Sequence, residues 1–136
     1  RGLKPCLLGA AHERGEMEAI ADVVRKAGRA VSVASGELDL AALAALLPMG
    51  RAMLSVDSGP AHLAAVQGLP VLCLFSGTNL ASQWSPFGPR VGVLQARGLP
   101  CAPCQLSVCP FDNACMKAIT PAVALAGALR LLGKPA

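Results

Sequence analysis

The chain has 136 residues, enough for one domain with a buried core. A hydrophobic fraction of 54% excludes a disordered chain, and an aromatic fraction of 3% is too low for the stacking surface of a single-strand nucleic-acid binder. The net charge of +4 comes from scattered Lys and Arg residues, which fits an anionic small ligand and gives no duplex-binding stripe.

Strand and helix patterns alternate along the chain. In chain order we expect a strand at residues 3–8, a helix at 17–27, a strand at 30–34, a helix at 40–47, a strand at 51–56, a helix at 60–67, strands at 70–75 and 91–94, and a helix at 120–132. Gly28 ends the first helix, Asp39 can cap the second, and Pro60 and Pro121 suit the starts of the last two.

Strands connected through helices of this length predict right-handed βαβ units and a parallel sheet. The strands are apolar throughout, which indicates that helices cover both faces of the sheet. We therefore expect an α/β fold, a Rossmann-like parallel sheet with helices on both faces, formed by a single domain over residues 1–136. Ligands of such sheets bind beyond the carboxyl ends of the strands.

The most informative segment is residues 55–63, Ser-Val-Asp-Ser-Gly-Pro-Ala-His-Leu, where an apolar strand runs directly into a helix. Ser58 or Gly59 can act as the N-cap, and Pro60 suits the first turn. The free amides of a helix start attract anions, and glycine lets an anion approach the backbone closely. Asp57 would repel a bare phosphate, so the segment favours a ligand with both phosphate and sugar hydroxyls. The alternative is an ordinary strand-to-helix turn.

Three further motifs follow in order. Residues 75–78 read F-S-G-T, residues 84–88 read W-S-P-F-G, and four cysteines spaced C-x2-C-x4-C-x5-C precede Met116. With the Asp57 segment, this series resembles the family nine glycosyltransferases, the group of bacterial lipopolysaccharide heptosyltransferases. The resemblance covers essentially the whole chain, but only the C-terminal half of such an enzyme. It implies the donor-binding half of a GT-B glycosyltransferase, in which two Rossmann-like domains face each other.

The resemblance implies a set of donor-binding residues: Asp57, Ser58, Gly59, Pro60, His62, Glu13, Leu38 and Thr78. In the family the backbone after the aspartate contacts the donor phosphates, and the aspartate itself lies by the sugar. His62 falls one turn into the helix, where a phosphate would favour its protonation; the alternative is local capping or packing.

Three of these residues match the family less closely. Glu13 corresponds to the glutamate of a G-x-x-x-E motif that binds the donor nucleoside, although it is also a favourable first-turn acid. Leu38 corresponds to a position that packs on the base. Thr78 follows the fourth strand and can hydrogen-bond the donor or the acceptor, but Ser76-Gly77 replaces the usual G-P before it.

The implied function is transfer of heptose from ADP-heptose to the lipopolysaccharide core, with inversion at the sugar carbon. We expect no catalytic residue and no cofactor in this chain, because the family's base lies in an N-terminal acceptor domain that the chain lacks. We expect a cytoplasmic protein that can contact the inner membrane and binds no nucleic acid. The alternatives are another nucleotide-sugar glycosyltransferase of the same architecture, or a zinc or thiol interaction module on an α/β scaffold.

Cys101, Cys104, Cys109 and Cys115 lie in a loop with few large apolar residues. Four thiolates suit tetrahedral zinc, and one C-x-x-C pair gives the usual short chelate. The same residues also fit free or transiently oxidised thiols, or two disulfides. Cys6 and Cys73 lie in strand patterns, and we expect both to be buried.

Overall fold

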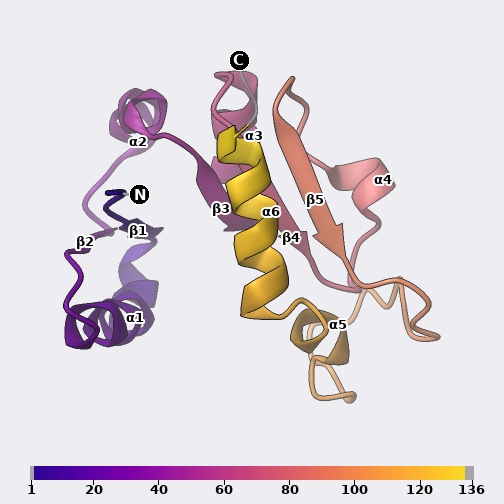
Figure 1. The fold of residues 1–136 in the computed structure, drawn as a ribbon. Helices are drawn as coiled ribbons and strands as arrows, with labels where there is room; N and C mark the ends of the chain where they lie inside the picture. Colours follow the sequence, from indigo (N-terminus) through magenta and orange to yellow (C-terminus); the bar gives the residue numbers. More distant parts are fainter. Residues whose placement is uncertain (1, 134–136) are drawn as a thin grey trace. The chain divides into compact units, whose positions relative to one another are not determined.

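A computed structural model describes residues 2–133 and divides the chain into two compact units, Arg1–Leu43 and Ala44–Ala136 (Figure 1). Strands pair within each unit, in one sheet of two strands and one of three. All of the pairings are parallel, as the sequence predicts. None of the helices in the described part of the chain is both long enough and apolar enough to span a membrane.

The first unit consists of β1 (Cys6–Gly9), the short helix η1 (Ala11–Glu13), α1 (Arg14–Lys26) and β2 (Ser32–Ser35). Helix α1 packs on both strands, with Ala21 fully buried. It ends where the sequence predicts, because Gly28 adopts a left-handed conformation with φ +71° and its N–H donates to Arg25 O. Helix α2 (Leu40–Leu46) leads on to the second unit, and Asp39 Oδ1 caps it by accepting from the Ala42 N–H at 2.7 Å.

The second unit contains η2 (Leu47–Met49), β3 (Met53–Val56), α3 (Gly59–Val66), β4 (Val71–Phe75), α4 (Ala81–Trp84), β5 (Val91–Gln95), α5 (Ala114–Lys117) and α6 (Pro121–Gly133). Its sheet has the order β3-β4-β5, so the most apolar strand is central. Val71, Cys73 and Phe75 of that strand are each at most 1% exposed.

Helices cover both faces of this sheet. Helix α6 lies across the front face of the sheet in Figure 1. Gly127 lets the helix approach Leu72 closely, because a Cβ at position 127 would lie only 2.9 Å from a Leu72 methyl group. Side chains alternate along a strand, so Val71 and Cys73 face the other side. Helix α3 packs there against β3 and β4, through buried alanines including Ala61. The expected covering of both faces is confirmed for this unit.

Three findings depart from the sequence-based expectations. The strands form two separate sheets in the described residues, where one sheet was expected. Cys6 is exposed, not buried: it is the first residue of β1, a four-residue strand that within residues 2–133 belongs to a sheet of two strands; Cys73 is buried as predicted. The elements η1, η2, α4 and α5 were not predicted, since each is a single turn without a detectable period.

Candidate functional site

The carboxyl ends of β3, β4 and β5 meet at one edge of the three-stranded sheet, because the strands are parallel and in register. Asp57 and Ser58 directly follow β3, residues 76–79 follow β4, and Gln95 is the last residue of β5. This edge is where an open parallel sheet binds its ligands. The second unit therefore gathers most of the expected donor-binding residues at one place.

No side chain caps the start of α3; Pro60 has no N–H and the Ala61 N–H donates to Ser58 O at 3.0 Å, which leaves the Gly59 N–H as the open donor of the first turn. Ser58, one of the two N-cap candidates, is the N-cap, with extended backbone angles of φ −158° and ψ 155°, and Pro60 lies in the first turn as expected. The Ser58 hydroxyl is 3.0 Å from the Ser55 hydroxyl and does not cap the helix. At Gly59 a Cβ would meet no atom within 4 Å, so the space above the backbone is open. The geometry suits an anion at the positive end of the helix dipole.

Asp57 lies between an amide and an imidazole. Its Oδ2 accepts a hydrogen bond from Asn79 Nδ2 at 3.0 Å, and its Oδ1 is 3.8 Å from His62 Nε2. The side chain of Asp57 is 23% exposed and that of His62 is 42% exposed, so both can reach a ligand. A carboxylate held in this way still accepts hydrogen bonds from hydroxyl groups. Sequence reasoning found Asp57 and His62 but missed Asn79.

Gln95 fixes the loop between β4 and α4. Its Nε2 donates to Ser76 O at 2.9 Å and to Asn79 O at 2.7 Å, and its Oε1 accepts from the Ala81 N–H at 3.3 Å. One side chain from the end of β5 thus uses both amide hydrogens and its carbonyl oxygen on a single loop. Sequence reasoning also missed Gln95; a polar residue ending an apolar strand is the signal that would have found it.

Thr78 lies in the same loop and is half-buried. Its N–H donates to Ser76 Oγ at 3.2 Å, and its carbonyl oxygen accepts from the Gln105 N–H at 3.3 Å. The neighbouring Gly77 O accepts from the Cys104 N–H at 2.8 Å. The loop after β4 is therefore attached to the cysteine-containing segment that follows β5.

The four clustered cysteines are free thiols with intermediate exposure. Within residues 2–133 the structure gathers no group of three or more Cys, His, Asp or Glu side chains that could hold a metal ion. Cys115 lies beside the loop after β4, since a Cβ at Gly77 would be 3.6 Å from its Sγ. Cys109 Sγ accepts from the Phe111 N–H at 3.4 Å. Zinc binding by Cys101, Cys104, Cys109 and Cys115 stays a prediction.

Cys73 is chemically different from the clustered cysteines. Burial raises the pKa of its thiol from 9.0 to about 11, and the negative charge of Asp57 adds to this effect. The thiol therefore stays protonated at neutral pH and is a poor nucleophile.

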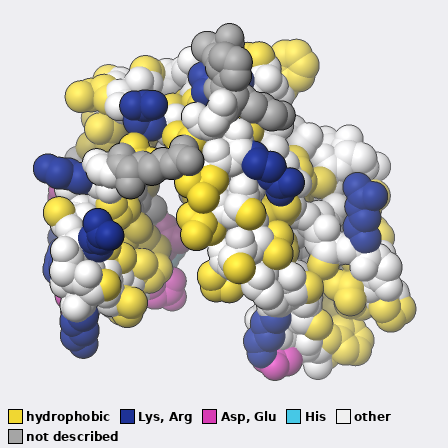
Figure 2. Space-filling view, in the orientation of Figure 1, with side chains coloured by type: hydrophobic (Ala, Val, Ile, Leu, Met, Phe, Trp, Pro, Cys, Tyr) yellow, Lys and Arg dark blue, Asp and Glu magenta, His cyan; other side chains and the backbone are white. Residues whose placement is uncertain are grey.

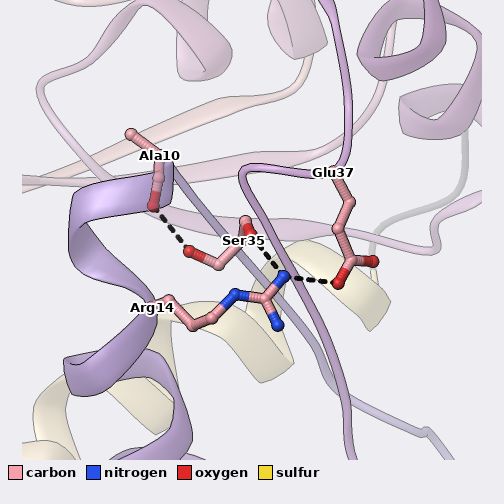
Figure 3. Close-up of polar contacts among 4 residues, drawn as sticks. All are labelled: Ala10, Arg14, Ser35 and Glu37. Carbon is pink, nitrogen blue, oxygen red and sulfur yellow. Dashed lines mark hydrogen bonds and ion pairs between the residues drawn. The ribbon is translucent and has the colours of Figure 1, made fainter.

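The remaining expected donor-binding residues, Glu13 and Leu38, lie in the first unit, each next in the chain to a residue drawn in Figure 3, Arg14 or Glu37. Glu13 Oε2 accepts from the Ala10 N–H at 2.6 Å, so one carboxylate oxygen is used at the start of its own helix. Arg14 donates to Ser35 O at 2.8 Å and to Glu37 Oε1 at 2.6 Å, while the buried Ser35 hydroxyl donates to Ala10 O at 2.6 Å. These bonds connect the segment after β1 with the segment after β2.

Leu38, the expected base-packing residue, lies next in the chain after Glu37 and is half-buried. It is therefore in the segment that Arg14 holds. Lys and Arg side chains stand singly on the face shown in Figure 2 and form no continuous basic stripe there.

Known proteins resemble the chain in sequence and in fold. The family model described as glycosyltransferase family 9 (heptosyltransferase) matches residues 1–115. Lipopolysaccharide heptosyltransferase 1 of Pseudomonas aeruginosa is 39% identical over 75 residues, which is 55% of this chain and 21% of that protein. Lipooligosaccharide heptosyltransferase 2 of Campylobacter jejuni is 35% identical over 77 residues, 56% of this chain and 24% of that protein.

A crystal structure of a family 9 glycosyl transferase from Veillonella parvula superposes with a TM-score of 0.77 at 22% identity, covering 96% of this chain and 37% of that one. This likeness confirms the expected fold, because the shared architecture extends over nearly all of the chain. The matches to the two curated relatives span only about a fifth to a quarter of those proteins. Because the family model matches most of the chain, residues 1–115, the chain belongs to glycosyltransferase family 9.

Proposed function

We propose that this chain is the donor-binding part of a glycosyltransferase that moves heptose from ADP-heptose to the lipopolysaccharide core. The observation that carries the proposal is the uncapped start of α3 beside Asp57, at the carboxyl edge of the sheet. Family membership supports the reaction class, and the two heptosyltransferase relatives support the sugar.

The amides at the start of α3 would bind the diphosphate of the donor. The open space at Gly59 leaves room for phosphate oxygens next to the backbone. As the bond between sugar and diphosphate breaks, negative charge builds up on the leaving diphosphate. Fixed N–H dipoles then stabilise that charge more in the transition state than in the ground state.

Asp57 would contact the sugar of the donor, and His62 would lie beside its diphosphate. Asp57 keeps free acceptor capacity on a partly buried carboxylate, which suits the hydroxyls of a sugar. His62, one turn into α3, presents an exposed imidazole toward the same edge and would add positive charge beside the phosphates when protonated. Thr78 in the neighbouring loop is the third side chain proposed for this edge.

Glu13 and Leu38 are proposed to bind the nucleoside, on the basis of the family resemblance. Glu13 has one carboxylate oxygen bound to the Ala10 N–H, and its second oxygen can accept from a ribose hydroxyl. The proposal has two further parts. Another domain of the enzyme would bind the acceptor and supply the catalytic base. The enzyme would act at the cytoplasmic face of the inner membrane.

Binding of ADP-heptose to wild type and to Gly59→Val tests this function. A Cβ at position 59 meets no atom within 4 Å, and the valine methyl groups beyond it fill the space that phosphate oxygens need, so we expect binding to be lost while the circular dichroism spectrum is unchanged. Ala122→Val is the matched control, because it adds the same methyl groups at an exposed position in the first turn of α6. Equal affinity in wild type and Gly59→Val would contradict the proposed anion site.

A further inference from the structure

We propose that Asn79 is a positioning residue that orients Asp57 toward the donor sugar, and that Gln95 holds Asn79 in place. This inference rests on the proposed function of Asp57. It concerns a residue for which neither the motif series nor the family resemblance gives a role.

The first step is the contact between the two side chains. Asn79 Nδ2 is 3.0 Å from Asp57 Oδ2, and an ionised carboxylate only accepts hydrogen bonds, so the amide must donate. The bond fixes one carboxylate oxygen without adding a charge. A lysine or arginine in this place would neutralise Asp57 and compete with a sugar for it. With asparagine, Oδ1 remains available on the side of His62, 3.8 Å away.

The second step is the support of Asn79 itself. Gln95 donates to the carbonyl oxygens of Asn79 and Ser76 and accepts from the Ala81 N–H. The loop between β4 and α4 is therefore held at three points by a residue of the neighbouring strand. A side chain whose backbone is fixed in this way loses less freedom when it binds its partner, so Asn79 is prepared to hold Asp57 in one rotamer.

The third step separates this role from a purely structural one. If Asn79 only stabilised the loop, its loss would weaken binding of every ligand at this edge. If it acts through Asp57, its loss should affect the sugar and spare the nucleoside diphosphate. The amides that would hold the diphosphate belong to α3, and Asn79 does not contact them through any hydrogen bond found in the described residues.

The test is a double-mutant cycle with two probes, ADP-heptose and ADP, titrated by NMR into the 136-residue chain. We expect Asn79→Ala to weaken ADP-heptose binding about tenfold, which corresponds to a coupling energy in the usual range for residues in contact, and to change ADP binding less than about twofold. In an Asp57→Asn background, adding Asn79→Ala should cause no further loss for ADP-heptose. The exposed Gln83→Ala, on α4 close in the chain, serves as the control and should match wild type.

Each other outcome has a distinct meaning. An Asn79→Ala variant that binds both probes as wild type does would overturn the positioning role and leave the proposed function intact. Equal losses for ADP and ADP-heptose, or the same tenfold loss with and without the Asp57 carboxylate, would also overturn it, because Asn79 would then act independently of Asp57. A wild-type chain that binds ADP-heptose no better than ADP would instead contradict the proposed sugar contact of Asp57, and the inference would fall with it.

Discussion

Gly88 lies against the carbonyl oxygen of Ala65, and a Cβ at position 88 would be 2.5 Å from that oxygen. This contact explains the last residue of the W-S-P-F-G motif. Pro86 is buried, whereas Trp84 and Phe87 are 55% and 89% exposed, and Gly88 is the residue of the motif that contacts α3. Close backbone packing at Gly88, and not the aromatic residues of the motif, therefore holds this turn against α3.

Gly88→Ala should therefore destabilise the fold, since the neighbouring atoms belong to the α3 backbone and cannot easily move. We expect a loss of about 1–3 kcal/mol in the free energy of unfolding, the usual range for overpacking. Gly59→Ala is the control, because a Cβ there meets no atom within 4 Å. Urea unfolding of both variants checks the prediction, which fails if they lose the same amount.

Gln105→Gly should stabilise the segment that follows β5. Gln105 adopts φ 51°, a left-handed conformation that costs a residue with a Cβ about 1–2 kcal/mol and costs glycine little. Part of this gain is offset by the greater freedom of glycine in the unfolded chain. The net increase in the free energy of unfolding should be about 0.5–1 kcal/mol, measured by urea unfolding. A decrease would show that the Gln105 side chain makes a stabilising contact.

The six cysteines should differ in reactivity. In chain freed of metal by a chelator, we expect Cys6 and the four clustered cysteines to react with a thiol reagent in the folded state, and Cys73 to react only after unfolding, because it is fully buried. Mass spectrometry of chain purified under reducing conditions counts the modified sites. Rapid modification of Cys73 would contradict its burial.

The same experiment tests the zinc site. Joint protection of Cys101, Cys104, Cys109 and Cys115 that is lost on chelation would show zinc binding. A measured metal content below about 0.2 zinc per chain would exclude it.

Cys73 should also lower stability at alkaline pH. Its pKa is raised from 9.0 to about 11 by burial, so between these values the unfolded chain loses the thiol proton while the folded chain keeps it. The unfolded state then binds fewer protons, and the free energy of unfolding falls as pH rises, by roughly 2 kcal/mol over the window. Cys73→Ala should lose this slope, although it is less stable overall. Parallel slopes for wild type and variant, measured by urea unfolding, would contradict the prediction.

The fold was largely predictable because its signals are local. Apolar runs, the Asp39 cap and the stop at Gly28 each act within a few residues, and the structure has strands and helices where these signals lie. Strand pairing was less predictable, since every strand offers the same backbone groups. The sequence therefore indicated parallel strands but not their division into two sheets.

The candidate site was predictable where a residue acts through its own position in the motif. Asp57, Ser58 and Gly59 are consecutive, and the strand-to-helix change that places them is visible in the sequence. Asn79 and Gln95 act on residues 22 and 16 positions away, through contacts that only the folded sheet creates. No local pattern marks such partners.

The central claim is that the start of α3 binds the diphosphate of a nucleotide sugar, and an NMR titration of the chain with ADP tests it most directly. We expect amide shifts centred on residues 58–62, with a second group at Glu13 from its proposed nucleoside role, and a dissociation constant on the order of 0.1–1 mM. In Gly59→Val the shifts at residues 58–62 should disappear. Shifts confined to the amino ends of β3 and β4, or full binding by Gly59→Val, would contradict the claim.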